Sequence, residues 1–179
     1  MPPERSMITE RAEELYVARA AVEDAPPYDL QVTVADLVHF LSSPEARLTP
    51  EQWRACQENP RLRADYMALK QRLSVAELPQ AVAASHGDLE ERLFPGGRLQ
   101  LRPSVVPGQV YLIVSIESAA STPRMLLIEG KNGDIARVAL PEPDPDGTML
   151  VIQDTLKNED DARAVRLLRD PSSSGVLLP

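Results

Sequence analysis

Residues 48–73, LTPEQWRACQENPRLRADYMALKQRL, contain two helix starts in succession and decide how the first half of the chain folds. Thr49 can cap a helix, a proline follows at the first helical position where its missing N–H is not needed, and Gln52 completes a capping box. Asn59, again followed by proline, repeats the arrangement. The sequence therefore predicts a short helix over residues 50–57 and a longer helix after Asn59.

Apolar residues recur at helical spacing throughout the first half. Residues 33–41 open with Thr33 and Asp36 at capping-box spacing, and residues 6–20 have the same periodicity further upstream. The apolar stripes are, in chain order, Ile8, Ala12, Leu15 and Tyr16; Leu37, Phe40 and Leu41; and Leu62, Tyr66, Leu69 and Leu73. These patterns predict a small helical domain of about four helices over residues 1–78.

After Gly97 the pattern changes to short apolar runs rich in Val, Ile and Leu, with turn residues between them. The strand candidates are RLQLR, QVYLIVSIE, RMLLIE, DIARVAL and TMLVIQ. Asn132-Gly133 is a strong hairpin signal, because both central residues of the favoured turn need positive φ. Residues 79–97 mix turn residues with a weak helical turn around residues 89–93, and we interpret them as an inter-domain linker.

Residues 162–179, ARAVRLLRDPSSSGVLLP, fit two descriptions. Ala164, Val165 and Leu168 suit a helix, whereas the closing SGVLL suits a strand that follows a turn at Asp170. We favour strand, turn, strand, because about six or seven short strands at regular spacing make a small sandwich or barrel. The predicted fold class is α+β, with helices over 1–78, a linker over 79–97 and a β-sandwich-like domain over 98–179.

Composition restricts the possible partners. A formal charge of −8 and a pI near 4.8 disfavour direct binding to nucleic acid or to an anionic membrane surface, and favour a basic protein partner. The single cysteine, Cys56, rules out an internal disulfide and fits a reducing compartment, so we expect a cytoplasmic protein. No run approaches the roughly 18 apolar residues of a membrane span, and the N-terminus lacks the apolar core of a signal peptide.

Side chains capable of catalysis or metal binding are sparse. Cys56, His39 and His86 have neither a nucleophile signature nor the paired spacing of structural zinc ligands. The segment EPDPDG, with Glu142, Asp144 and Asp146 followed by Gly147, is similar to the start of a calcium loop, but its twelfth position is Gln153 and not the required glutamate. We interpret it as a solvated hairpin loop, and expect no enzyme, metal or cofactor.

Over residues 36–73 the order of features resembles the zinc-associated anti-sigma domain of bacterial anti-sigma factors. The apolar residues from Leu37 to Leu41 match the first helix, Leu48-Thr49-Pro50-Glu51 matches its Leu-Ser-Pro-Glu entry to the second, and Asn59-Pro60-Arg61-Leu62-Arg63 takes the place of Cys-Pro-x-Cys-Arg. Asn59 and Leu62 replace both cysteines, and Ala55 replaces the histidine. Zinc is thereby excluded, while Asn59 can cap the next helix and Leu62 can add an apolar contact.

This resemblance implies a regulatory protein that occludes a sigma factor until it is released by a protease or a trigger protein. The expected partner-binding residues are Tyr16, Leu37, Phe40, Leu41, Trp53 and Tyr66, because large apolar and aromatic side chains carry most interface energy. Residues 81–97 are a candidate cleavage segment. For each of the six residues, a place in the chain's own core is the competing interpretation.

Two other classes of function stay open. The chain can be an adaptor whose helices bind a protein other than a sigma factor and whose β domain binds a ligand or protein of its own. A small hydrolase with a site between the domains is a third hypothesis, which the missing nucleophile, base and oxyanion loop disfavour.

Overall fold

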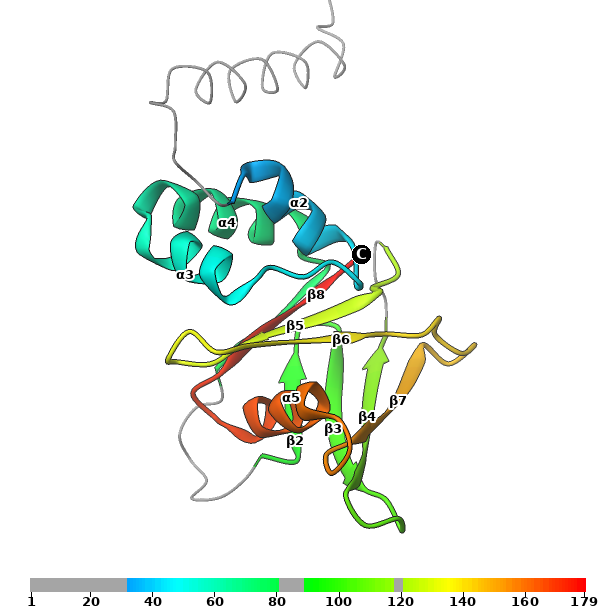
Figure 1. The fold of residues 1–179 in the computed structure, drawn as a ribbon. Coiled ribbons are helices and arrows are strands. Elements are labelled where there is room, and N and C mark those ends of the chain that lie inside the picture. The colour runs from blue at the N-terminus through cyan, green and yellow to red at the C-terminus, as the bar shows by residue number, and fades with distance from the viewer. Residues whose placement is uncertain (1–31, 81–88, 118–120) are drawn as a thin grey trace, which may run out of the picture. The chain divides into compact units, whose positions relative to one another are not determined.

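The computed structural model describes residues 32–80, 89–117 and 121–179 (Figure 1). Residues 32–179 form one compact unit. This part of the chain is α+β, with four helices and two antiparallel sheets of four strands each. The helix expected over residues 6–20, with Tyr16, lies outside the described residues, and so does His86. None of the described helices is long and apolar enough to cross a membrane.

The elements follow one another in a simple order. Three helices come first, and a fourth lies between the last two strands. The helices are α2 (Val34–Ser42), α3 (Pro50–Glu58), α4 (Pro60–Leu73) and α5 (Glu159–Arg169). The strands are β1 (Ala76–Leu78), β2 (Glu91–Phe94), β3 (Gly97–Pro103), β4 (Gln109–Ile116), β5 (Met125–Glu129), β6 (Ile135–Ala139), β7 (Thr148–Asp154) and β8 (Ser174–Leu178). All five strand candidates from the sequence are confirmed.

Both predicted capping boxes are present. At α2, the Asp36 amide donates to Thr33 Oγ1 at 3.3 Å, and the Thr33 amide donates to Asp36 Oδ2 at 2.7 Å. At α3, the Gln52 amide donates to Thr49 Oγ1 at 3.2 Å, and the Thr49 amide donates to Gln52 Oε1 at 2.9 Å. Each cap satisfies backbone donors that have no partner inside the helix, which is worth about 1 kcal/mol.

Asn59 and Leu62 connect α3 to α4 as the sequence predicts. Asn59 Oδ1 accepts hydrogen bonds from the amides of Arg61 at 2.9 Å and Leu62 at 3.3 Å. The Leu62 side chain is 3% exposed, and the Cys56 thiol lies 3.9 Å from its carbonyl oxygen. A side-chain cap and a contact between the Cys56 thiol and the Leu62 backbone thus join the two helix ends.

The strand order is β1-β8-β5-β6 in one sheet and β2-β3-β4-β7 in the other. The turn between β5 and β6 contains Asn132 and Gly133, and Gly133 has φ of +81°, so the predicted hairpin is confirmed. Since β6 and β7 belong to different sheets, the loop with Glu142 is a connection between the sheets and was wrongly expected to be a hairpin loop.

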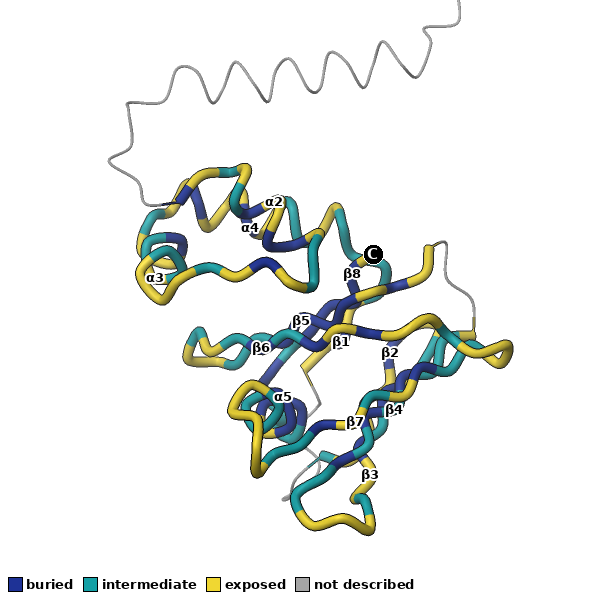
Figure 2. Tube along the Cα trace, turned by 45° about the vertical axis from the view of Figure 1, so that its right-hand side comes forward, coloured by how far each residue is buried: buried dark blue, intermediate teal, exposed yellow. Residues whose placement is uncertain are grey.

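The first sheet is covered on both faces. Leu126 and Ile128 of β5 lie in a core that also contains residues of the second sheet and of α5. Met125 and Leu127 point to the opposite face because side chains alternate along a strand, and both have no measurable exposure. The helices α2–α4 lie on that opposite side (Figure 1), and β5 and β8 are buried along most of their length (Figure 2).

The preference for strand over helix before residue 170 was wrong, since this segment is α5. Asn158 caps the helix by accepting from the amides of Asp160 and Asp161 at 3.0 and 3.4 Å. Acidic residues fill its first turn and arginines its last turn, which complements the helix dipole. Its apolar residues Ala164, Val165, Leu167 and Leu168 are all buried.

Residues 76–97 were expected to form the end of the helical domain and a linker, and the structure differs from this expectation. α4 ends at Leu73, and β1 follows at once and pairs with β8. The weak helical turn expected around residues 89–93 is instead mostly strand β2. Arg92 of β2 is 5% exposed and donates to the carbonyl oxygens of Leu168 at 2.9 Å and Ser173 at 2.8 Å, which ties the supposed linker to the end of α5.

Candidate functional site

Five of the six predicted partner-binding residues lie in the described α2–α4 layer, and three of them, Phe40, Trp53 and Tyr66, are next to the β5–β6 hairpin. Leu37 and Leu41 have no measurable exposure, Phe40 is 2% exposed and Tyr66 is 4% exposed, while Trp53 is half-buried. These five side chains therefore pack within the chain's own fold. A partner that bound through the four buried ones would first have to separate the helices from the sheet.

Arg137 of β6 holds the end of α2. Its neighbours Ala136 and Val138 point into the core, so the Arg137 side chain points to the other face, toward the helices. The guanidinium donates to the carbonyl oxygen of Phe40 at 2.6 Å and also to those of Ser43 and Ala46. It lies 4.3 Å from the centre of the Phe40 ring. Carbonyls at a helix C-terminus lack partners inside the helix and attract a cation, which explains the contact.

The electrostatic setting of Arg137 is unusual. The pKa of Arg137 is lowered from 12.5 to about 10. Burial is the main cause, and the positive charge of Arg47 is the second. At neutral pH the guanidinium is still fully charged. It is therefore a fixed cation inside the contact between the helices and the sheet.

Glu129, at the end of β5, forms the second polar contact with the helices. The Tyr66 hydroxyl donates to Glu129 Oε1, and Lys70 of α4 forms an ion pair with Oε2. Burial, followed by the negative charge of Glu129, raises the pKa of Tyr66 well above its ordinary value of 10. The phenol therefore stays protonated and donates to the carboxylate.

Trp53 of α3 lies between these two contacts. Its ring centre is 6.2 Å from that of Phe40 and 5.3 Å from that of Tyr66, the second pair being edge to face. The indole N–H donates to the carbonyl oxygen of Gly133 at 2.9 Å, and the Gln57 amide donates to the same oxygen at 3.3 Å. α3 is thus attached to the turn of the β5–β6 hairpin.

Two hollows border Trp53. One, which we call the arginine hollow, has a volume of about 410 Å³ and is lined by Phe40, Trp53, Ile135 and the arginines Arg47, Arg137, Arg163 and Arg166, among others. The other, the tyrosine hollow, has a volume of about 360 Å³ and is lined by Trp53, Cys56, Tyr66, Met67 and Glu129, among others. The helices therefore meet the hairpin through discrete contacts separated by open space.

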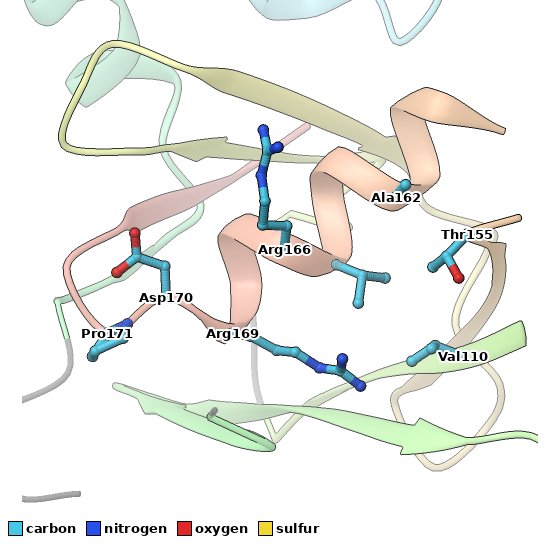
Figure 3. Close-up of a pocket in the computed structure, with 8 residues that line it drawn as sticks. Val110, Thr155, Ala162, Arg166, Arg169, Asp170 and Pro171 are labelled. Atoms are coloured by element: carbon cyan, nitrogen blue, oxygen red, sulfur yellow. The ribbon is translucent and has the colours of Figure 1, made fainter. Parts of the chain in front are cut away.

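A third hollow of about 470 Å³ lies beside α5 (Figure 3). Arg169 extends from the end of α5 toward the strand that carries Val110, whereas Arg166 points the other way (Figure 3). Asp170 at its edge has a lowered pKa because Ser172 donates hydrogen bonds to its carboxylate. This arrangement brings no nucleophile next to a base.

Nucleophilic or metal chemistry finds no support in the described residues. Cys56 is 1% exposed, and burial raises the pKa of its thiol, so the thiolate form is disfavoured. His39 is exposed on α2. Within residues 32–80, 89–117 and 121–179, no three His, Cys, Asp or Glu side chains gather in a way that could hold a metal ion.

Comparison of the chain with protein-family models, with curated proteins and with solved structures gives no match.

No pattern in the sequence pointed directly to Arg137 or Glu129. Both lie in apolar strands, where a charged residue ordinarily faces solvent, and the helices that cover this face precede them by more than fifty residues. The one available signal was indirect: Asn132-Gly133 located the turn that Trp53 contacts.

Proposed function

We propose that the chain is a cytoplasmic regulatory protein that binds a protein partner through its α2–α4 layer, and that this partner is a sigma factor kept inactive until it is released. The observation that carries the proposal is the junction of α3 and α4. Asn59 and Leu62 replace the two zinc-binding cysteines of the family that the segment resembles. Asn59 caps α4, and Leu62 is buried with its carbonyl oxygen next to the Cys56 thiol of α3. A helical module joined without metal supports a zinc-free anti-sigma protein.

The proposed contact surface is formed by exposed apolar side chains of α2 and α4, one of which, Met67, also borders the tyrosine hollow. Phe40 and Tyr66 are in contact with residues of the chain's own sheet, so they hold the α2–α4 layer in place. Val38 of α2 and Met67 of α4 are exposed by 40% and 49%. Large apolar side chains of this kind, on rigid helices, are suitable anchors for a partner.

The acidic charge of the whole chain supports a basic partner, although the α2–α4 layer itself is close to neutral. The chain has a formal charge of −8, and opposite charge on a partner raises the association rate and favours the correct orientation. The DNA-binding regions of a sigma factor are basic. Salt should therefore slow the association more than it speeds dissociation.

In this proposal the strands form a sandwich-like regulatory part, which receives a release signal from a protease or a trigger protein. Residues 81–97 remain the proposed cleavage segment. The bonds of Arg92 to the end of α5 place one part of this segment, β2, within the fold. Residues 81–88 lie outside the described residues.

An adaptor for a protein other than a sigma factor is the alternative. It is favoured by the outward face of the second sheet, where Leu150 and Ile152 of β7 are exposed by 52% and 54%. Their cross-strand neighbours on β4 are Ile113 and Tyr111. Four apolar side chains on one face are enough for a second protein contact.

The experiment is recovery of partners by the tagged full-length chain from its native host, followed by mass spectrometry. We compare the double variant Val38→Arg, Met67→Arg with Leu156→Arg, a control at a position that is 74% exposed. We expect a sigma factor with the unchanged chain and the control, and its loss with the double variant. If only other proteins are recovered, and if the Leu150→Arg variant no longer recovers them, the adaptor replaces the sigma-factor proposal.

A further inference from the structure

The arginine hollow has the size and the apolar surface of a small-molecule site. Its volume of about 410 Å³ lies within the range of roughly 300–1,000 Å³ that such sites occupy. Trp53 supplies aromatic surface from α3, and Leu48 and Ile135 supply aliphatic surface from the loop before α3 and from β6. A planar, apolar body can rest on these side chains.

The lining is positively charged although the chain is acidic. Arg47 comes from the loop between α2 and α3, Arg137 from β6, and Arg163 and Arg166 from α5. The lining also contains two aspartates, Asp134 and Asp160. Its formal charge is therefore +2, whereas the whole chain has a formal charge of −8. Positive charge is thus concentrated where three separate elements converge.

The rim arginines have partners that an anion can replace. Arg166 Nη2 lies 3.5 Å from Asp134 Oδ2, and both side chains are more than half exposed. Arg163 Nη1 lies 3.4 Å from Asp160 Oδ1, with side-chain exposures of 39% and 64%. Exposed ion pairs of this length contribute little stability, so exchanging the carboxylate for a ligand costs little.

Arg47 and Arg137 have different roles in the hollow. Arg47 uses Nη1 to donate to the carbonyl oxygens of Pro44 at 2.7 Å and Ala46 at 3.0 Å, which leaves Nε and Nη2 to meet a ligand. All three nitrogens of Arg137 donate within the fold. Arg47 helps to lower the pKa of Arg137, so the two cations are close enough to repel each other, and an anion beside them would relieve that repulsion.

We propose that the arginine hollow binds a small organic anion, a planar apolar body that carries a carboxylate or a phosphate. The apolar body packs on Trp53 and Ile135, and the anionic group meets Arg47 and Arg166 at the rim. This site is separate from the proposed sigma-factor contact, because neither Val38 nor Met67 lines the arginine hollow.

Trp53 makes the test direct, because it is the only tryptophan in the chain and borders the hollow. The full-length chain is titrated at low salt with adenosine monophosphate and with benzoate, and Trp53 emission is recorded. Adenosine is the uncharged control, and inorganic phosphate tests the anionic group alone. Isothermal calorimetry provides a second readout that does not depend on the indole.

We expect saturable binding of at least one of the two organic anions with a dissociation constant below about 1 mM. Which of them binds distinguishes a phosphate from a carboxylate ligand. The double variant Arg47→Ala, Arg166→Ala should weaken binding about tenfold or more, since hydrogen bonds between charged groups are lost. Arg102→Ala, an exposed change on β3, should leave it unchanged. Asp134→Asn, which removes a competing carboxylate, should strengthen binding.

Three results would overturn the proposal. The first is no saturable signal from either organic anion up to about 10 mM, by fluorescence and by calorimetry. The second is equal affinity for adenosine and adenosine monophosphate. The third is unchanged affinity in the Arg47→Ala, Arg166→Ala variant when its thermal unfolding matches that of the unchanged chain.

Discussion

The indole N–H of Trp53 donates to the carbonyl oxygen of Gly133 at 2.9 Å, and this bond joins residues that are 80 positions apart in the chain. It attaches α3 to the turn of the β5–β6 hairpin. Arg137 attaches α2, and Glu129 attaches α4, to the same hairpin. One hairpin therefore holds all three helices of the layer.

Replacing Gly133 with alanine should loosen this attachment. The backbone has φ of +81°, which costs a residue with a Cβ about 1–2 kcal/mol, and the new atom would lie 2.5 Å from Gln57 Oε1. We expect a loss of unfolding free energy of about that size and a red shift of Trp53 emission. Urea unfolding measures the first. Lys131→Ala, an exposed change in the same turn, is the control, and equal stability of both variants would contradict the prediction.

Arg137→Lys tests whether the branched guanidinium is needed. A lysine keeps the charge but cannot reach the carbonyl oxygens of Phe40, Ser43 and Ala46 together. Leaving buried carbonyls without donors should lower the unfolding free energy by about 1–3 kcal/mol. Hydrogen exchange should show faster opening of α2. Arg124→Lys, at a side chain that is 65% exposed, should change neither quantity.

Asn59 should behave as a cap and not as a surface residue. Asn59→Ala removes the acceptor for the amides of Arg61 and Leu62, which should cost about 1 kcal/mol. Asn59→Asp keeps an acceptor and places a negative charge at the helix N-terminus, so it should retain the stability. Thermal unfolding of the two variants side by side decides this. An aspartate variant as unstable as the alanine variant would exclude capping.

The pKa of Tyr66 predicts a loss of stability in alkali. Its pKa is raised in the folded chain above the ordinary value of 10, so above that pH the unfolded chain releases the phenol proton while the folded chain keeps it. The contribution of Tyr66 is complete below pH 10 and is lost as the pH rises toward the folded-state pKa. Tyr66→Phe should flatten this fall when unfolding free energy is measured against pH, and Tyr111→Phe should not. If the unfolding free energy of the Tyr66→Phe variant falls with pH as steeply as that of the unchanged chain, the prediction is wrong.

Local signals in the sequence predicted the elements better than their assembly. Thr33, Thr49 and Asn59 locate three helix starts, because a cap acts within a few residues. The strand β2 was missed because four residues are too few for a clear alternation. α5 was assigned wrongly because regular strand spacing was preferred and the helix start at Asn158, with its acidic first turn, was not recognised.

The candidate site was predicted only in part. The helical periodicity identified Phe40 and Tyr66 as large residues on one face, but it could not say whether that face meets a partner or the chain's own sheet. The answer depends on Glu129 and Arg137, whose pairing with the helices is a long-range contact. Such contacts leave no periodic pattern in a single sequence.

Competition for the sigma factor tests the proposed occlusion most directly. The sigma factor recovered from the host is labelled and bound to core RNA polymerase, and the full-length chain is added while the polymerase-bound fraction is measured. If the chain occludes the polymerase-binding surface, it displaces the sigma factor, and the variant Val38→Arg, Met67→Arg does not. A stable complex that contains the chain, the sigma factor and the polymerase together would contradict the proposal.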